Sequence, residues 1–194
     1  MINAGALVVT DCVLSNTRDA KQAILDFVRV FAGDKNIHYD SEVAASEMEH
    51  RFGNAALANY MKSRGNLAND IEDVLDVYFH QCSIAMSCRD LARMFLPLAN
   101  KGVSPIANTR VLSEARTKRV NAVLLTCGLY DAVGNFAFRV GLPAKSGVGG
   151  GIVAIMPNEF SVAVWAPELE ESGNSLVGTE ALALLTTLTG KSIF

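Results

Sequence analysis

Apolar residues recur at helical spacing over the first two thirds of the chain, and this pattern predicts a series of helices. The first is expected from about Ser15 to Gly33, where a polar start precedes Ile24, Phe27, Val28 and Phe31. One or two more are expected between residues 40 and 65. Asp70 is expected to cap the next helix, because a carboxylate there accepts bonds from free helical N–H groups.

Two further helices carry signals at their ends. Ser87 followed by Asp90 resembles a capping box, with Asp where Glu or Gln is usual. Pro97 is expected to kink or shorten that helix, because proline has no N–H to donate. Ser113 is expected to open another helix, which ends at Gly128.

The last third of the chain has a different pattern. A glycine-rich stretch at 147–151 leads into an apolar run at 152–156, a turn at Pro157-Asn158-Glu159 and a second run at 160–165. These features predict a β-hairpin. A closing helix is expected from about Leu176.

The predicted elements include too few strands for a stable sheet, because a two-stranded ribbon alone is marginal in water. The chain also begins abruptly, with an apolar run at Ala4 to Val9. We therefore expect the C-terminal part of a larger α+β fold whose remaining strands come from upstream sequence. The predicted division is a mainly helical lobe at 1–130 and, at 131–194, a lobe with the glycine-rich loop, the hairpin and the closing helix.

Composition limits the class of protein. Half of the 194 residues are apolar and 19% are charged, which is typical of a folded globular chain. Seventeen basic residues against 20 acidic ones give a net charge of −3, so nucleic acid is not an expected partner. No apolar stretch is long enough to span a membrane and no signal segment is visible, so a cytoplasmic protein is expected.

Cysteine and histidine show no metal-binding or disulfide spacing. The four cysteines are interpreted as buried thiols: Cys12, Cys82, Cys88 and Cys127. A nucleophilic cysteine, Cys127 or Cys82 activated by His80, is an alternative enzyme hypothesis. Residues two apart on a helix, such as His80 and Cys82, do not face each other, which argues against that pair.

The glycine-rich stretch is the first candidate for chemistry. Its glycines precede a strand, whereas phosphate-binding loops precede a helix, so nucleotide binding is not expected. At Lys145-Ser146-Gly147 the backbone can approach a substrate closely, with a cation and a hydroxyl beside it. An N–H group that follows could stabilise an oxyanion. The alternative is a plain loop with a solvated lysine.

This triplet is similar to the Lys-Thr-Gly or Lys-Ser-Gly strand of serine β-lactamases and penicillin-binding proteins, whose partner motif is Ser-x-x-Lys. The 194 residues contain no Ser-x-x-Lys. Ser15-Asn16-Thr17-Arg18 is a near match, but arginine cannot accept a proton. A penicillin-recognising peptidase would also need an export signal, and none is visible.

Four motifs in order carry a more specific resemblance: Met1-Ile2-Asn3-Ala4-Gly5-Ala6-Leu7, Ser46-Glu47-x-Glu49-x-x-x-x-Asn54-Ala55-Ala56, Tyr78-Phe79-His80, and Gly141-Leu142-Pro143-Ala144-Lys145-Ser146-Gly147-Val148-Gly149-Gly150-Gly151-Ile152. Together they resemble the serine-dependent glutaminases. The resemblance runs along the whole chain and includes Gly173-Asn174-Ser175-Leu176.

The resemblance implies a β-lactamase/DD-peptidase-like fold, with a helical lobe beside a sheet built from both ends of the chain. It implies hydrolysis of L-glutamine to L-glutamate and ammonia through a serine acyl-enzyme, without a metal or organic cofactor, in a homo-oligomer. The family's nucleophile helix, with its Ser-x-x-Lys, would lie upstream of Met1. The chain alone is therefore expected to be inactive, and a non-catalytic helical binding or regulatory module is the alternative function.

The resemblance also assigns site residues. Those implied for the substrate are Asn3, Glu47, Asn54, Tyr78, Tyr130 and Val148. Those implied for catalysis are Tyr78, Lys145, Ser146 and Val148, with the Val148 N–H as half of an oxyanion hole.

Glu47 is a reasonable partner for the substrate ammonium. It precedes Asn54 by seven residues, so the two would share a face if their helix is continuous. Other interpretations stay open: Glu47 as a solvated surface acid, Asn54 as a helix cap, Tyr78 as core filling and Tyr130 as a packed loop aromatic.

Overall fold

Residues 3–194 are described by a computed structural model of the protein, and they divide into two units. Unit 1 contains the residues up to Val30 together with Asp34–Met86, and unit 2 contains Phe31–Gly33 and Ser87–Phe194. Met1 and Ile2, which begin the first glutaminase-like motif, lie outside the described residues. The predicted division at residue 130 stays a prediction.

Unit 1 is a helical bundle with one short two-stranded ribbon. Its elements are α1 (Ala4–Asn16), α2 (Ala20–Ala32), β1 (His38–Tyr39), α3 (Ser41–Glu49), α4 (Phe52–Ser63), α5 (Ile71–Cys82) and β2 (Ile84–Ala85). Helices α1, α4 and α5 bury a common apolar cluster around Leu7, Met61, Leu75 and Phe79. Helix α3 packs against α5 as well.

The start of unit 1 differs from the prediction. The sequence predicts one helix from Ser15, but the structure has α1 followed by α2, with Thr17 in an extended conformation between them. The apolar run at Ala4 to Val9 is the first half of α1. Its buried positions, Leu7, Thr10 and Asp11, are spaced as one helical face. Because two of these three buried residues are polar, the spacing of apolar residues alone does not indicate the helix.

Asp11 joins α1 to the loop before α5. Its carboxylate accepts hydrogen bonds from the backbone N–H groups of Ala68 and Asn69, each at 2.9 Å, and from the Asn69 side chain at 2.9 Å. Burial acts to raise the pKa of Asp11, but these bonds and the nearby Lys62 hold it below its ordinary value. The ionised carboxylate is therefore part of the unit's structure.

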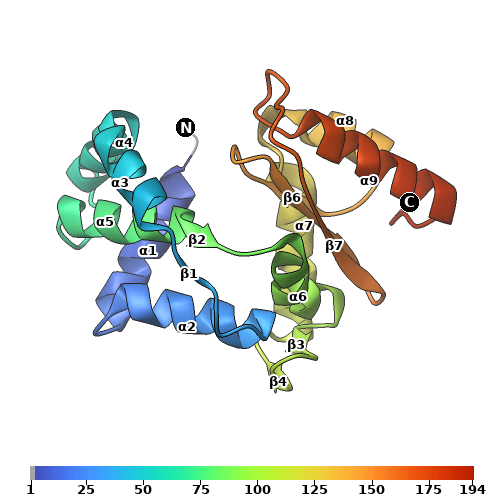
Figure 1. The fold of residues 1–194 in the computed structure, drawn as a ribbon, viewed down its shortest axis with the longest axis horizontal. Helices are drawn as coiled ribbons and strands as arrows, with labels where there is room; N and C mark the ends of the chain where they lie inside the picture. Colours follow the sequence, from blue (N-terminus) through green and yellow to red (C-terminus); the bar gives the residue numbers. More distant parts are fainter. Residues whose placement is uncertain (1–2) are drawn as a thin grey trace. The chain divides into compact units, whose positions relative to one another are not determined.

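Unit 2 contains a three-stranded antiparallel sheet and the helices that pack on it (Figure 1). Its elements are α6 (Cys88–Ala99), β3 (Val103–Ser104), β4 (Thr109–Arg110), α7 (Glu114–Cys127), η1 (Tyr130–Ala132), α8 (Val133–Arg139), β5 (Ala144–Ser146), β6 (Gly151–Met156), β7 (Phe160–Trp165) and α9 (Leu176–Thr189). Helices α6 and α9 contact β6 and β7, and α7 contacts β5. The buried cluster of the unit includes Phe136, Leu142, Ile152 and Leu182.

The predicted hairpin is confirmed as β6 and β7, with Ile152 opposite Val164. It is not alone, because the Lys-Ser-Gly segment forms β5, which pairs with β6 so that Ser146 lies opposite Ile152. The strand order is β5-β6-β7. Within the described residues β5 and β7 are therefore the edge strands of this sheet.

The predicted helix caps are confirmed. The Asp70 side chain accepts from Glu72 N–H, Ser87 and Asp90 form a reciprocal capping box, and Ser113 caps α7. The expectation that Pro97 kinks or shortens its helix stays a prediction, since α6 ends at Ala99, two residues after Pro97. Proline near a helix end removes only one late hydrogen bond, which limits its effect.

The interpretation of the cysteines as buried thiols is wrong. All four are exposed. Three of them stand at helix ends: Cys82 is the last residue of α5, Cys88 is the first of α6 and Cys127 is the last of α7. Residues at helix ends are less enclosed by neighbouring turns than residues at the middle of a buried face.

The α+β class is confirmed by this arrangement of helices and small antiparallel sheets. None of the helices within residues 3–194 is long and apolar enough to cross a membrane.

Candidate functional site

Asn3 and Asn54 meet in unit 1. The Asn3 side-chain amide donates to Asn54 Oδ1 at 3.0 Å, which links the start of α1 to the first turn of α4. Asn3 has a φ of 72°, in the left-handed region that few residues other than glycine adopt. Left-handed backbone at a non-glycine residue is common at functional sites, and here it accompanies two amide groups at one place.

Glu47 and Tyr78 lie around a third residue, Cys82. Tyr78 is buried and belongs to the core cluster of the unit. Cys82 is exposed as a residue, but partial burial of its sulfur raises the pKa of the thiol; a hydrogen bond with the Tyr78 side chain acts to lower this pKa, and the charge of Glu47 raises it. The pairing of α3 with α5 therefore places a carboxylate, a phenol and a thiol close together.

The spacing argument for Glu47 and Asn54 is wrong, because they do not share a continuous helix. Helix α3 ends at Glu49 and α4 begins at Phe52. Asn54 is not a helix cap either, since Arg51 occupies that position. Asn54 is instead bonded to Asn3, while Glu47 lies near Cys82.

In unit 2, the predicted site residues Lys145 and Tyr130 contact each other. The Lys145 ammonium lies 4.9 Å from the centre of the Tyr130 ring, a cation–π contact, and it donates to the Ser146 carbonyl. Burial of this ammonium lowers the pKa of Lys145, although the residue as a whole is exposed. Tyr130 has a φ of 53°, which is strained for an aromatic residue.

The loop between β5 and β6 presents free backbone donors. Gly147 N–H donates to Gly151 and Gly150 N–H donates to Gly147, which closes a turn with Val148 and Gly149 at its tip. Within residues 3–194 the Val148 N–H has no hydrogen-bond acceptor. An unpaired N–H held in a turn is the type of donor that an oxyanion hole uses.

Two other features lie beside this loop. Gly173 is a neighbour of both residues: a Cβ atom at this position would lie 3.6 Å from the Val148 side chain and 3.7 Å from the Tyr130 ring. The Ser146 hydroxyl is buried and has no hydrogen-bond partner among the described residues. Buried hydroxyls are normally bonded, so Ser146 retains an unused donor and acceptor next to Lys145.

Each unit thus brings together some of the predicted residues. Unit 1 joins Asn3 to Asn54 and Glu47 to Tyr78, and unit 2 joins Tyr130, Lys145, Ser146 and Val148. The sequence indicated Cys82 only as an alternative nucleophile and not as a partner of Tyr78, because their contact arises from the four-residue spacing on α5 and requires the helix to be placed.

The nucleophilic-cysteine alternative gains no support from His80. Its Nδ1 contacts Asp76, at 3.2 Å from the carboxylate, and its ring meets Tyr39 edge to face. These partners fit a structural histidine. Among residues 3–194, no three His, Cys, Asp or Glu side chains gather as a group that could hold a metal ion.

The glutaminase family model matches residues 1–194. The chain belongs to the glutaminase family. A glutaminase of Vibrio vulnificus is 56% identical over 193 residues, and one of Christiangramia forsetii is 52% identical. This glutaminase-family chain spans about 63% and 64% of the length of these two relatives.

Solved structures agree with the family assignment. The chain resembles a Bacillus subtilis glutaminase, YbgJ, solved as a covalent complex with 5-oxo-L-norleucine, with a TM-score of 0.92 and 34% identity. It resembles a probable glutaminase, YbaS, with a TM-score of 0.90 and 36% identity. The chain covers 69% and 62% of these proteins. The predicted β-lactamase-like fold is confirmed.

Proposed function

We propose that these 194 residues are the substrate-binding part of a glutaminase that hydrolyses L-glutamine to L-glutamate and ammonia through a serine acyl-enzyme. The observation that carries the proposal is the family match along the whole chain, combined with the absence of any Ser-x-x-Lys from its 194 residues. The nucleophile would then belong to sequence outside them. A non-catalytic module of the same fold is the alternative.

The polar groups of unit 1 suit the α-amino and α-carboxyl groups of a free amino acid. Glu47 would bind the ammonium as a charge-assisted pair, because it is the acid of the family motif. The amide groups of Asn3 and Asn54 would donate hydrogen bonds to the carboxylate. Tyr78 would handle a proton, and its hydrogen bond with the Cys82 thiol would help to orient the ring.

The groups of unit 2 suit the reacting amide. Attack by a serine oxygen on the side-chain carbonyl carbon places negative charge on the carbonyl oxygen, and the unpaired Val148 N–H would stabilise it. The C–N bond then breaks and ammonia leaves with the proton taken from the serine. The Lys145 ammonium, packed against the Tyr130 ring, would keep the site electropositive, and the Ser146 hydroxyl would carry a hydrogen bond to substrate.

The test is an ammonia-release assay on two proteins. One is the 194-residue chain, and the other is a fusion in which the upstream segment of the Vibrio vulnificus glutaminase precedes Met1. That relative is 56% identical, so its segment should fit. We expect background rates from the chain and turnover from the fusion, because only the fusion can form an acyl-enzyme.

A fusion that folds without turnover would favour the non-catalytic module. Turnover by the chain alone, lost in Cys127→Ala, would overturn the proposal in favour of a cysteine nucleophile. A cytoplasmic location and a homo-oligomeric assembly, which were expected above, stay predictions.

A further inference from the structure

Two consecutive backbone carbonyls fix the segment that precedes Tyr130. The Gly128 carbonyl accepts a hydrogen bond from Ser146 N–H of β5 at 3.2 Å. The Leu129 carbonyl accepts one from the side-chain amide of Asn174 at 3.3 Å, although the two residues are 45 positions apart. The backbone that leads into Tyr130 is therefore attached both to β5 and to the loop that contains Asn174.

Asn174 belongs to the loop between β7 and α9, which is closed by its own hydrogen bonds. Glu170 N–H donates to the Asn174 carbonyl at 2.8 Å, and Gly173 N–H donates to the Glu170 carbonyl at 2.9 Å. The Asn174 side chain also donates to Ser172 Oγ at 2.9 Å, and the residue is only 1% exposed. A side-chain amide has two N–H hydrogens, so both are used and the amide is fixed.

Tyr130 requires such fixed surroundings. Its φ of 53° is unfavourable for a residue with a side chain, and a conformation of this kind persists only where neighbouring contacts determine it. In this conformation the Tyr130 ring contacts the Lys145 ammonium and is a neighbour of Gly173, the residue before Asn174. The backbone of Tyr130 and the position of its ring therefore depend on the same loop.

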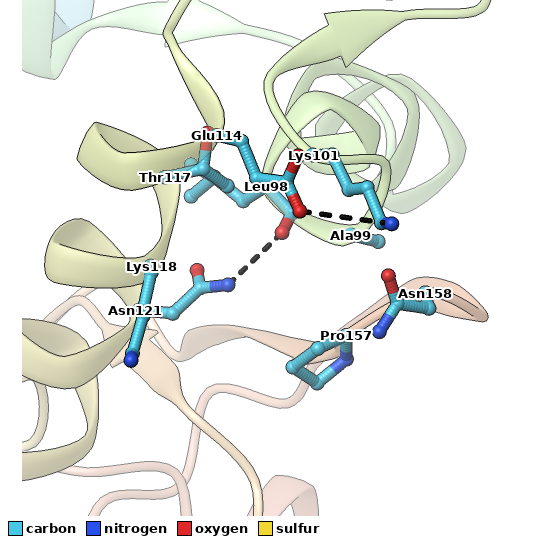
Figure 2. A pocket seen from close by; sticks show the side chains of 9 residues that line it. All are labelled: Leu98, Ala99, Lys101, Glu114, Thr117, Lys118, Asn121, Pro157 and Asn158. Atoms are coloured by element: carbon cyan, nitrogen blue, oxygen red, sulfur yellow. Dashed lines mark hydrogen bonds and ion pairs between the residues drawn. The ribbon is translucent and has the colours of Figure 1, made fainter.

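A second buried asparagine of unit 2 makes the same type of bond elsewhere. Asn121 of α7 is 8% exposed, and its Nδ2 donates to the Leu98 carbonyl of α6 at 3.0 Å (Figure 2). It lines a cavity of about 310 Å³ together with Pro157 and Asn158 of the turn between β6 and β7. The loop at 147–150 is at the opposite end of β6, so Asn121 offers a matched comparison outside the candidate site.

We propose that Asn174 is a positioning residue of the candidate active site, and that its bond to the Leu129 carbonyl holds Tyr130 where its ring contacts Lys145. The inference rests on the proposed function, which assigns Tyr130 and Lys145 to the reacting amide. Asn174 acts through Tyr130 and not by contact with substrate, because its side chain is buried. The glutaminase-like motif Gly173-Asn174-Ser175-Leu176 thereby gains a role.

The first test follows the Tyr130 ring by fluorine NMR of the 194-residue chain labelled with 3-fluorotyrosine. The chain has four tyrosines, and the other three belong to unit 1 and serve as internal references: Tyr39, Tyr60 and Tyr78. The Tyr130 signal is identified by its loss in Tyr130→Phe. We expect Asn174→Ala to shift this signal toward that of an exposed fluorotyrosine and to leave the other three in place, because the ring is no longer held beside Lys145.

Asn121→Ala is the matched control, because it removes the same type of bond from the same unit. It should leave the Tyr130 signal in place. An unchanged Tyr130 signal in Asn174→Ala, or equal shifts in the two variants, would overturn the proposal.

A stability measurement covers the case in which Asn174→Ala folds poorly. Glycine adopts a φ of 53° without strain, so a Tyr130→Gly chain has less need of the Asn174 bond. Asn174→Ala should therefore lower the urea midpoint less in the Tyr130→Gly chain than in the native chain. Equal losses in the two chains, unfolding of both included, would contradict the proposal.

The second test measures L-glutamine turnover by the active fusion. Asn174→Ala should lower kcat by roughly fivefold to tenfold and leave KM within about twofold, because Tyr130 is assigned to the reacting amide and Glu47 to the substrate ammonium. Asn121→Ala should leave both constants within about twofold. An unchanged kcat in Asn174→Ala would overturn the proposal. A native fusion without turnover would contradict the proposed function, and the fluorine signals would still decide whether Asn174 positions Tyr130.

Discussion

Replacing Glu47 by Gln in the active fusion is expected to lower kcat/KM for L-glutamine by roughly ten- to two-hundredfold. Glutamine at this position keeps the shape of the side chain but removes the charge that would bind the substrate ammonium. A charge-assisted hydrogen bond is worth about 1.5–3 kcal/mol, and this free energy corresponds to the expected decrease in kcat/KM. Ammonia release over a series of glutamine concentrations measures it.

Glu49→Gln is the matched control, because Glu49 is the other acid of the same motif and is exposed on the same helix. It should leave kcat/KM within about twofold, as is usual for surface substitutions. N-acetylglutamine tests the assigned role, since acetylation removes the ammonium charge. Discrimination against it should shrink in Glu47→Gln, and equal losses on both substrates would show that Glu47 does not bind the ammonium.

Replacing Asp11 by Ala is expected to lower the free energy of unfolding by about 3 kcal/mol, because two backbone N–H groups and the Asn69 amide lose a charged acceptor. Urea unfolding followed by circular dichroism measures the loss. Asp26→Ala, on the exposed part of α2, should change stability by no more than about 0.5 kcal/mol. Equal effects of the two substitutions would contradict the structural role of Asp11.

The contribution of Asp11 should also depend on pH. Its pKa is lowered in the folded chain from an ordinary value of 3.8, so its stabilisation is complete above pH 3.8 and is lost as the pH falls through the lowered value. Asp11→Asn keeps the shape but cannot ionise. The stability difference between the native chain and this variant should therefore narrow below pH 3.8, and a constant difference would contradict the assignment.

Local signals in the sequence predicted the parts of the fold that depend on neighbouring residues. The capping box of Ser87 and Asp90 and the turn at Pro157-Asn158-Glu159 both appear where the residues indicate. Helix α1 was missed because its buried face contains Thr10, which bonds to the Ala6 carbonyl of its own helix, and Asp11, which is stabilised by residues more than fifty positions away. Apolar periodicity does not detect a buried carboxylate.

In the candidate site, too, local signals were predictable from the sequence and tertiary contacts were not. The motif around Lys145 identified the β5–β6 loop, but the contact of Lys145 with the Tyr130 ring depends on the folding of a segment fifteen residues earlier. Helix α3 ends before Asn54, and the partners of Glu47 and Asn54 come from other segments: Cys82 ends α5 and Asn3 precedes α1. Residue types were predictable, whereas pairings required the tertiary structure.

The central claim is that these 194 residues bind the substrate while the nucleophile belongs to sequence outside them. It is tested most directly by peptide mass mapping of the fusion after reaction with 6-diazo-5-oxo-L-norleucine, the reagent used for the solved Bacillus subtilis complex. The claim predicts one adduct, on the serine of the upstream Ser-x-x-Lys, formed more slowly in Glu47→Gln. An adduct on Cys127, or on any other residue from Met1 to Phe194, would contradict it.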